Sequence, residues 1–241
     1  MTMHYRPVYP ATEIAKIAPD IAPDMAPEAL LPRLHFQRRQ SLYRDSAKRV
    51  LDLISVAVLA LPALLILAIF IPLVALDGAA PLYRQARIGR GGKRFTMWKL
   101  RSMVADADAR LEAYLAANPG ARIEWDRHQK LRNDPRVTRI GSFIRRASID
   151  ELPQLWNVLK GDMSLVGPRP MMPNQQEIYP GNAYYELRPG ITGAWQVSDR
   201  HESSFAERAL FDTAYYNNLS LGTDLSIMAR TVGVVLRAAG V

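Results

Sequence analysis

The sequence predicts a mainly helical α+β fold, that of a monotopic membrane protein with one re-entrant hydrophobic helix and interfacial amphipathic helices. Three kinds of segment lead to this prediction. A nearly uncharged apolar run extends from Val50 to Leu76. Several later stretches repeat their apolar residues at helical spacing, and two short runs of strand-like residues flank a glycine-rich turn. The chain therefore divides into a polar N-terminal part, a membrane segment and one further domain.

Residues 1–40 form the polar N-terminal part, which we predict to be a disordered extension. Prolines recur through this segment among alanine and acidic residues, and no apolar run is long enough to bury a face. Such a composition does not offset the entropy cost of folding. We assign no chemistry to this segment.

The membrane segment is predicted over residues 41–77. Its apolar run is long enough to cross the hydrocarbon core of a bilayer. The run begins too far along the chain, and is too long, to be a cleaved secretory signal. Pro62 lies near its middle and has no N–H to bond the carbonyl group of Val58. We therefore expect a kink there, or two short half-helices.

Basic residues lie on both sides of the apolar run. They are Arg38, Arg39, Arg44, Lys48 and Arg49 before it, and Arg84, Arg87, Arg90, Lys93 and Arg94 after it. A helix that crosses a membrane usually shows an asymmetry of lysine and arginine between its two sides. We therefore favour a re-entrant helix whose ends return to the same side. A spanning helix stays open as the alternative, because proline-kinked helices also cross membranes.

Asp52 is the one ionisable residue inside the apolar run. An unpaired carboxylate is costly at membrane depth. Lys48 and Arg49 precede it by one helical turn, which places their side chains within reach. We interpret Asp52 as a structural residue with an intrahelical partner.

Residues 78–241 are predicted to form a single domain. The runs around the turn Gly89–Gly92 predict a β-hairpin. Helices are expected at 102–117, 137–147, 151–160, 203–217 and 224–238, with irregular structure between 161 and 200. The sequence Asn118-Pro119-Gly120 should end the first of these helices. We expect amphipathic helices of this domain to lie at the membrane surface.

The formal net charge of +8 favours a polyanionic partner. Nucleic acid, an anionic membrane leaflet and phosphate-bearing substrates all fit this charge. The absence of cysteine excludes disulfide bonds and thiolate metal sites. The four histidines show no spacing typical of metal ligands.

The most informative stretch holds the adjacent carboxylates of Asp150 and Glu151. From the residues alone, Asp150 is expected to cap a helix that has Pro153 in its first turn. The free N–H groups at such a helix start would also stabilise an anion. A carboxylate can in addition attack phosphorus and form an acyl phosphate. Capping and catalysis are therefore compatible at this position.

Several motifs resemble those of the bacterial sugar transferases, also called monotopic phosphoglycosyl transferases. They are KRVLD at 48–52, KLRSM at 99–103, DELPQL at 150–155, GPRP at 167–170 and RPGITG at 188–193. The resemblance covers roughly residues 46–241. It implies that residues 78–241 are a catalytic domain on the cytoplasmic face of the bacterial inner membrane.

The same resemblance implies a reaction. Asp150 would attack the phosphate joined to the sugar of a nucleotide sugar, expel the nucleoside monophosphate and hold the sugar phosphate until a lipid phosphate takes it. The chain is similar to the short transferases of exopolysaccharide pathways, which makes UDP-glucose or UDP-galactose the expected donor and undecaprenyl phosphate the acceptor. Mg²⁺ is the expected cofactor, because Asp150, Glu151 and a diphosphate would otherwise repel one another. Whether Glu151 binds the metal or manages the acceptor's proton stays open.

Basic residues in the motifs are candidates for phosphate binding. Arg169 lies between prolines and has a guanidinium fork suited to phosphate. Lys99 and Arg101 lie on a predicted strand at period two and would project to the same face, toward phosphate or lipid headgroups. Arg146 and Arg188 are weaker candidates, because each could simply form a surface ion pair.

One alternative is a membrane-anchored basic binding module without catalysis. Recognition of nucleic acid would call for basic residues interleaved with stacking aromatics. The tryptophans are instead scattered through apolar segments, so we expect no nucleic-acid partner. The expected partners are the UDP-sugar, undecaprenyl phosphate and membrane lipid, and a homodimer stays open.

Overall fold

A computed structural model describes residues 42–76, 78–128, 131–198, 205 and 208–236, and helices dominate this part of the chain. The predicted extension at 1–40 lies outside the described residues. The α-helices are α3 (Lys48–Ala75), α4 (Ala107–Ala117), α5 (Pro119–His128), α6 (Arg139–Arg146), α7 (Gln154–Lys160), α8 (Ala183–Glu186), α9 (Arg208–Asn217) and α10 (Leu221–Leu236). Short helical turns are η1 (Tyr43–Ala47), η2 (Arg90–Gly92), η3 (Ile149–Glu151) and η4 (Pro173–Gln175). The strands are β1 (Leu82–Ile88), β2 (Arg94–Leu100), β3 (Ser164–Val166) and β4 (Gly190–Thr192).

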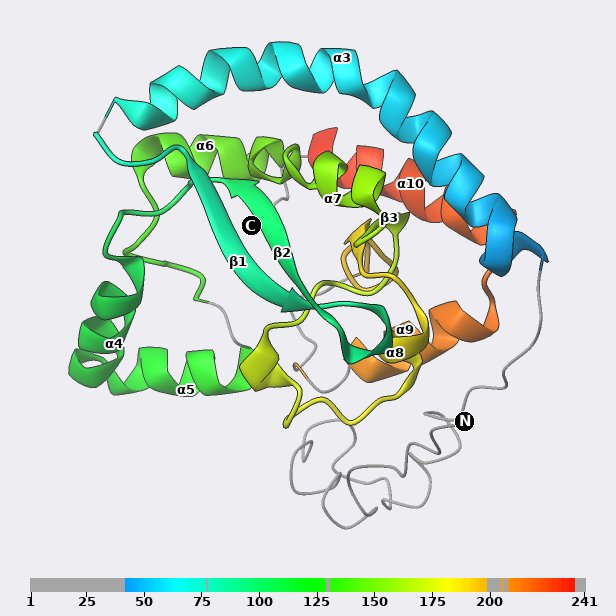
Figure 1. The fold of residues 1–241 in the computed structure, drawn as a ribbon. Helices are drawn as coiled ribbons and strands as arrows, with labels where there is room; N and C mark the ends of the chain where they lie inside the picture. Colours follow the sequence, from blue (N-terminus) through cyan, green and yellow to red (C-terminus); the bar gives the residue numbers. More distant parts are fainter. Residues whose placement is uncertain (1–41, 77, 129–130, 199–204, 206–207, 237–241) are drawn as a thin grey trace.

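Helix α3 is the apolar segment, and it is continuous through Pro62 and Pro72. It arches over the rest of the domain (Figure 1). The expected half-helices are therefore replaced by one bowed helix, because a lost backbone bond can be absorbed as curvature. The helix is long and apolar enough to cross a membrane, and only 11% of its most apolar window is buried. It is thus unlike the core helix of a soluble protein, which is mostly buried.

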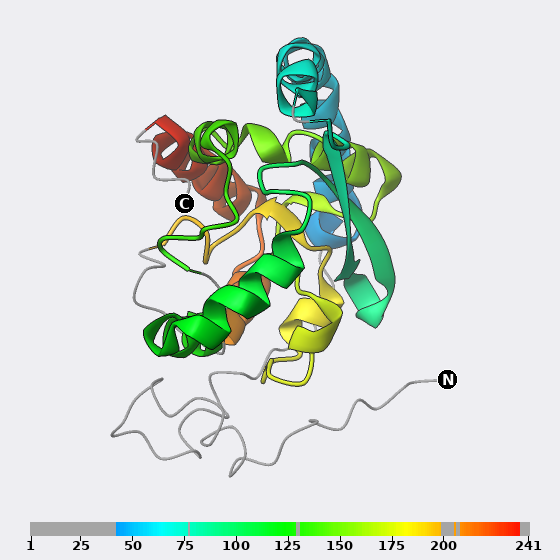
Figure 2. The ribbon, with the colours of Figure 1, turned by 90° about the vertical axis from the view of Figure 1, so that its left-hand side faces the viewer.

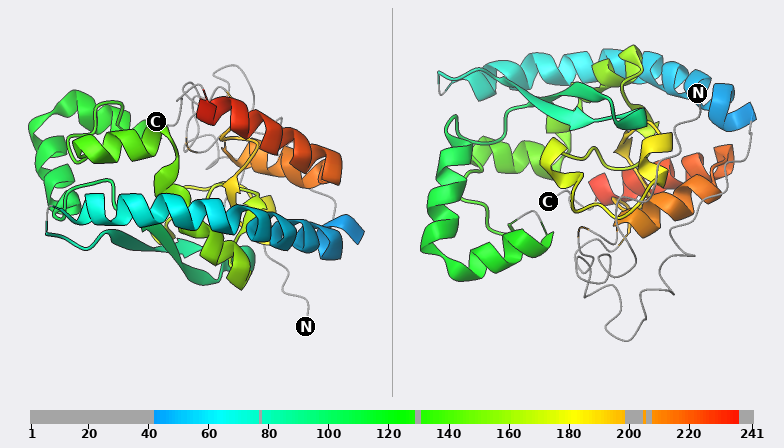
Figure 3. Two further views of the ribbon diagram at one scale, coloured as in Figure 1. Left: turned by 90° about the horizontal axis from the view of Figure 1, so that it is seen from above. Right: turned by 60° about the horizontal axis from the view of Figure 1, so that its bottom comes forward.

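Both ends of α3 pack on the same domain, while most of its middle stays exposed (Figures 1 and 3). Near the C-terminal end, Val74 is buried in a cluster with Leu100 and Ile144. Phe70 stacks there on Phe143 of α6, with ring centroids 5.8 Å apart. The N-terminal end contacts α7 and β3. The rest of the described chain therefore lies along one side of the arch (Figures 1 and 3).

The N-terminal end of α3 is held by buried polar contacts. Asp224 of α10 is fully buried and accepts hydrogen bonds from Lys48 Nζ (2.6 Å), Tyr43 (2.6 Å) and Tyr215 (2.5 Å). Asp52 accepts from the Ser164 hydroxyl and from the N–H of residue 165, each at 2.9 Å. The predicted intrahelical partner of Asp52 is therefore wrong. Its structural role rests on β3, because Lys48 pairs with Asp224 instead.

The C-terminal end of α3 is capped by Arg101. Its guanidinium donates to the carbonyl oxygens of Val74 (2.9 Å), Ala80 (2.8 Å) and Met103 (3.1 Å). The last carbonyl groups of a helix have no partner within the helix, so a side chain that reaches them stabilises the end. Arg101 thereby joins α3 to the end of β2.

The predicted hairpin is confirmed. Strands β1 and β2 pair antiparallel from Leu82↔Leu100 to Ile88↔Arg94. Gly91 and Gly92 have positive φ in the turn, which glycine adopts without strain. A second, parallel pair, β3 with β4, lies inside the stretch predicted to be irregular. A Cβ on Gly167, just after β3, would lie 2.3 Å from the carbonyl oxygen of Arg188. The GPRP and RPGITG segments are therefore packed backbone against backbone.

The predicted helices are present with shifted ends. Asn118-Pro119-Gly120 ends the first of them as predicted, since α4 ends at Ala117 and Asn118 is extended. A further helix that was not predicted, α5, begins at Pro119. Proline is well suited to the first helical position, where its missing N–H costs nothing. Helices α4 and α5 make a corner on the side of the domain away from α9 and α10 (Figures 1 and 2).

We predict that Asp224→Ala lowers the free energy of unfolding by about 3–5 kcal/mol, because it leaves the Lys48 ammonium buried without its carboxylate. The double variant Lys48→Met/Asp224→Leu should recover most of this loss. Chemical unfolding in detergent micelles measures both. Asp106→Ala is the matched control, since its pair with Arg110 is exposed and worth less than about 1 kcal/mol. A loss no larger than that of the control would contradict the prediction.

Candidate active site

Asp150 and Glu151 lie in a tight reversal between α6 and α7. The reversal begins at Ser148, whose φ of 55° is left-handed. Such a conformation in a non-glycine residue costs about 1–3 kcal/mol and often marks a functional site. The turn Ile149–Glu151 follows, and Pro153 then caps α7 without any side-chain bond. The expected capping role of Asp150 is therefore wrong, and its carboxylate points elsewhere.

Asn157 positions α7 against the hairpin. Its amide nitrogen donates to the carbonyl oxygen of Thr96 (2.7 Å), and its amide oxygen accepts from the N–H of Trp98 (3.1 Å). Asn157 is fully buried, so both bonds are protected from water. Sequence reasoning missed this residue, although a polar residue on the apolar face of a helix is a signal. Asn157 brings the start of α7 to the strand that carries Lys99.

Lys99 joins the two carboxylates. Its Nζ lies 2.8 Å from Glu151 Oε1 and 3.4 Å from Asp150 Oδ2. The exposed fractions of these side chains are 21% for Lys99, 23% for Glu151 and 8% for Asp150. The more buried carboxylate is thus the one that sequence analysis predicts to be the nucleophile. Lys99, Asp150 and Glu151 form one compact charged cluster.

Burial raises the pKa of Asp150, Lys99 opposes that shift, and the neighbouring Glu151 adds to it. Arg145 also favours the carboxylate form of Asp150. The Nε–H of Arg145 donates to the Ser102 hydroxyl at 2.8 Å, which holds the guanidinium in place. A buried carboxylate with specific cationic partners is typical of active sites. The carboxylate form of Asp150 is therefore favoured by Lys99 and Arg145.

The donor set for a metal consists of the two adjacent carboxylates. In the described part of the chain, no three His, Cys, Asp or Glu side chains gather in a metal-binding group. Mg²⁺ is usually held by one or two carboxylates together with substrate phosphates, so Asp150 and Glu151 fit this ion. The same pair already binds a cationic group, the ammonium of Lys99.

Arg169 lies in the turn after β3, with its guanidinium 5.8 Å from the ring centre of Trp195. Its positive charge acts on Arg145, which also interacts with Asp150. Asp150 attracts the Arg145 guanidinium and Arg169 repels it. Sequence analysis did not select Arg145 as a candidate.

The other predicted phosphate-binding residues lie outside this cluster. The donors of Arg101 go to carbonyl groups at the end of α3, so Lys99 and Arg101 have different partners. Arg188 donates through Nε to the carbonyl oxygen of Gly161 (3.0 Å), at the opposite end of α7 from Asp150. Arg146 is exposed at the end of α6. For these three residues phosphate binding stays a prediction.

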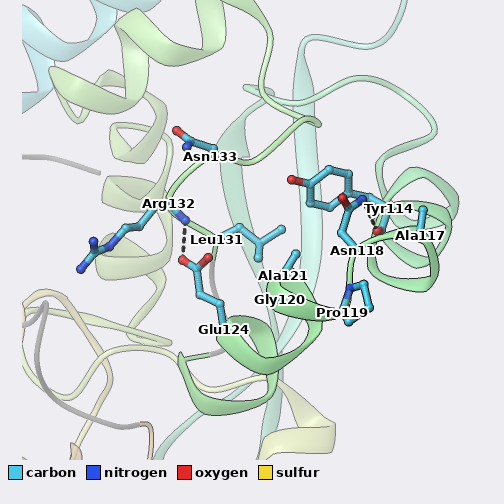
Figure 4. Close-up of a pocket in the computed structure, with 10 residues that line it drawn as sticks. All are labelled: Tyr114, Ala117, Asn118, Pro119, Gly120, Ala121, Glu124, Leu131, Arg132 and Asn133. Atoms are coloured by element: carbon cyan, nitrogen blue, oxygen red, sulfur yellow. Dashed lines mark hydrogen bonds between the residues drawn. The ribbon is translucent and has the colours of Figure 1, made fainter.

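A separate hollow of about 400 Å³ lies at the corner between α4 and α5 (Figure 4). Its lining includes Tyr114, Asn118 and Leu131, and Glu124 accepts a hydrogen bond there from the N–H of Arg132 (2.7 Å). None of the predicted site residues lines it. We assign it no part in the chemistry of Asp150.

Comparison with known proteins agrees with the motifs. The family described as bacterial sugar transferase matches residues 43–238. A UDP-galactose-lipid carrier transferase of Erwinia amylovora is 50% identical over 198 residues, which are 80% of this chain and 41% of the relative. An undecaprenyl-phosphate galactose phosphotransferase of Salmonella typhimurium is 49% identical over 166 residues, 68% of this chain and 35% of the relative. The chain thus spans about two fifths of the length of the first relative and about one third of the second.

A shorter relative matches over most of its own length. The exopolysaccharide production protein ExoY of Rhizobium meliloti is 42% identical over 200 residues, which are 80% of this chain and 87% of the relative. The matched region of this chain therefore corresponds to nearly the whole of that protein.

We predict that Lys99→Met raises the pKa of Asp150, because the ammonium that favours its carboxylate form is lost. That carboxylate would then be lost at a higher pH during acidification. Carboxyl ¹³C chemical shifts, followed through a pH titration, measure this change. Arg146→Met, which removes an exposed cation, is the control. An unchanged titration in Lys99→Met would contradict the electrostatic role of Lys99.

Proposed function

Because the chain belongs to the bacterial sugar transferase family, we propose that it transfers a hexose 1-phosphate from a UDP-sugar to undecaprenyl phosphate. UMP would be released, and the lipid would carry a diphosphate-linked sugar. The observation that carries the proposal is the buried Asp150 carboxylate, held by Lys99 beside Glu151 in a domain attached to an apolar helix. Family membership also argues against the binding-module alternative.

Asp150 is the proposed nucleophile. A carboxylate oxygen attacks the phosphorus joined to the sugar, and the P–O bond to the nucleoside phosphate breaks. The electron pair of that bond leaves with UMP, and Asp150 holds the sugar phosphate as an acyl phosphate. An oxygen of the lipid phosphate then attacks the same phosphorus and returns Asp150 to its carboxylate form. Two large substrates can use one site in turn by this route, which gives ping-pong kinetics.

The neighbours of Asp150 have distinct proposed roles. Lys99 and Arg145 favour the ionised form of the buried Asp150 against the effect of burial. Glu151 and Asp150 would hold Mg²⁺, which when bound supplies positive charge against the substrate phosphates. Glu151 is the more exposed of the two, which suits a residue that meets the incoming metal–substrate complex.

We further propose that α3 enters one leaflet and returns, rather than crossing the bilayer. Its two ends both pack on the same domain, and a spanning helix would separate them by the membrane thickness. Other helices carry exposed apolar residues suited to the interface: Ile140 and Phe143 on α6, Trp156 and Leu159 on α7, and Leu221, Leu225, Val232 and Leu236 on α10. The flanking basic residues favour the cytoplasmic face. Asp150 would then lie near the headgroup plane, where the phosphate of the acceptor is found.

The donor is proposed to be UDP-galactose or UDP-glucose, and the product the first lipid-linked sugar of an exopolysaccharide repeat unit. The names of the Erwinia and Salmonella relatives refer to galactose, so UDP-galactose is the first donor to test.

We predict that Asp150→Asn abolishes UMP release from the preferred UDP-sugar, because an amide cannot form the acyl phosphate. Purified full chain in lipid nanodiscs would be assayed with a panel of UDP-sugars, with Mg²⁺ and undecaprenyl phosphate present or withheld. The loss should be at least about a thousandfold, the size typical when a covalent nucleophile is removed. Asp108→Asn, an exposed aspartate on α4, is the control. Activity of Asp150→Asn near that of wild type would sink the nucleophile assignment.

We predict that positions before and after α3 are labelled from the same side of the membrane. The chain has no cysteine, so Ser46→Cys and Ala80→Cys each introduce a single reactive thiol at an exposed position. A membrane-impermeant maleimide should label both in inverted vesicles and neither in intact cells. Leu64→Cys, near the middle of the arch, should resist labelling in either case. Labelling of the two flanking positions from opposite sides would establish a spanning helix instead.

A further inference from the structure

A second group of arginines contacts the GPRP turn. Arg87 near the end of β1 donates to the carbonyl oxygen of Pro170 (3.0 Å). Arg208 at the start of α9 donates to the carbonyl oxygen of Arg169 (2.6 Å). Residues far apart in sequence thus hold adjacent peptide groups of the same turn. Arg87, Arg169 and Arg208 are called the arginine cluster below.

The arginine cluster has an excess of buried positive charge. Arg208 is 5% exposed, and the Nε atoms of Arg87 and Arg208 are buried without a hydrogen-bond partner. Within the described residues, no carboxylate forms an ion pair with any member of the cluster. Asp212, which interacts with Arg208, accepts instead from the Tyr179 hydroxyl at 2.6 Å. Burial raises the pKa of Asp212 to about 6, so its charge is itself costly.

A buried cation without an anion is unfavourable. Taking a guanidinium out of water costs several kcal/mol unless an opposite charge and full hydrogen bonding compensate. Here like charges add to the cost, since burial, and then Arg169 and Arg208, lower the pKa of Arg87 to about 10. Support of the turn alone would need only the two bonds to carbonyl groups. Arg87 also donates to the side-chain oxygen of Gln85. The Nε–H groups of Arg87 and Arg208, which have no acceptor, indicate a site for an anion.

Aromatic rings orient the cluster. The guanidinium of Arg208 lies 4.8 Å from the ring centre of Phe205 and 5.3 Å from that of Trp195. The guanidinium of Arg169 lies over the same Trp195. Rings that cover the faces of a guanidinium leave its N–H edge for hydrogen bonds, and such a fork fits the oxygens of a phosphate.

The location of the cluster favours a soluble ligand. Strand β1 starts near the C-terminal end of α3 and runs away from it, toward α8 and α9 at the far end of the domain (Figure 1). The cluster therefore lies at the end of β1 that points away from the C-terminal end of α3 (Figure 1). Arg145 interacts electrostatically with both Arg169 and Asp150. A ligand that extends from Asp150 toward water would pass from one site to the other.

We propose that Arg87 and Arg208, on either side of Arg169, bind the phosphate that leaves with the nucleoside. This inference rests on the proposed function and identifies the place of the leaving group. When Asp150 forms its bond to phosphorus and the P–O bond to UMP breaks, negative charge grows on the departing phosphate. Guanidinium groups already fixed in a dry site stabilise that charge without rearrangement. A lipid phosphate offers the same chemistry, so the test separates the two sources.

The test is calorimetric titration of full chain in lipid nanodiscs with UMP, with uridine, and with undecaprenyl phosphate added to the discs. Arg87→Gln and Arg208→Gln should each weaken UMP binding by about ten- to a hundredfold, the equivalent of one lost charge-assisted hydrogen bond. Uridine binding should stay the same, because it has no phosphate. Arg84→Gln, an exposed arginine on the same strand as Arg87, is the matched control. Arg208→Lys, which keeps the charge, replaces Arg208→Gln if that variant does not fold.

Several results would overturn the inference. UMP affinity within twofold of wild type in both variants would do so, and so would equal losses for UMP and uridine, which indicate a purely structural role. Loss of undecaprenyl phosphate binding with UMP binding intact would show that the cluster binds the phosphate of the acceptor lipid instead. Arginine-dependent UMP binding without UMP release from any UDP-sugar would leave the site standing and remove the proposed function. Normal turnover with an unchanged KM for UDP-sugar in both variants would support the proposed function and overturn the proposed role of the arginine cluster.

Discussion

The architecture depends on how the two ends of α3 are attached to the rest of the domain. An apolar helix that exposes most of its length gains little from packing on its own protein, so polar contacts at its ends must set its position. At one end Lys48 is buried against Asp224, and at the other Arg101 bonds the last carbonyl groups. Such contacts are directional, whereas apolar contact with lipid is not. The height of the active site relative to a membrane would therefore follow from these two attachments.

Two groups of charged residues bear on the proposed reaction. Asp150 and Glu151 lie around Lys99 at the start of α7, and the arginine cluster holds the GPRP turn. Arg145 interacts electrostatically with a member of each group, Asp150 and Arg169. A substrate with a diphosphate would place its reacting phosphorus at the carboxylates and its leaving phosphate among the arginines. Both groups are largely shielded from water, where electrostatic interactions are stronger.

Local patterns were sufficient for much of the fold. The apolar run, the hairpin around Gly89–Gly92 and the helices after residue 137 were predictable, because hydrophobic period and turn residues are properties of neighbouring positions. Errors arose where local signals had two meanings. Asn118-Pro119-Gly120 ends α4 as predicted, but Pro119 also starts α5, which was not predicted, and the backbone reversal at Ser148 keeps Asp150 from capping α7. In the stretch from 161 to 200, the β3–β4 pair joins strands too short to show a period.

The sequence by itself determined the kind of chemistry and its main candidates, because the carboxylates of Asp150 and Glu151 are adjacent and the motifs around them have a recognisable spacing. The tertiary structure alone decided which groups surround them. Asn157 meets Thr96, Asp52 meets Ser164, and Arg208 meets the turn at Arg169 across long stretches of chain. These contacts follow from packing between distant segments, and no local pattern of residues encodes which buried polar group will meet which. The same packing separates Arg101 and Arg188 from Asp150 while bringing Lys99 to it.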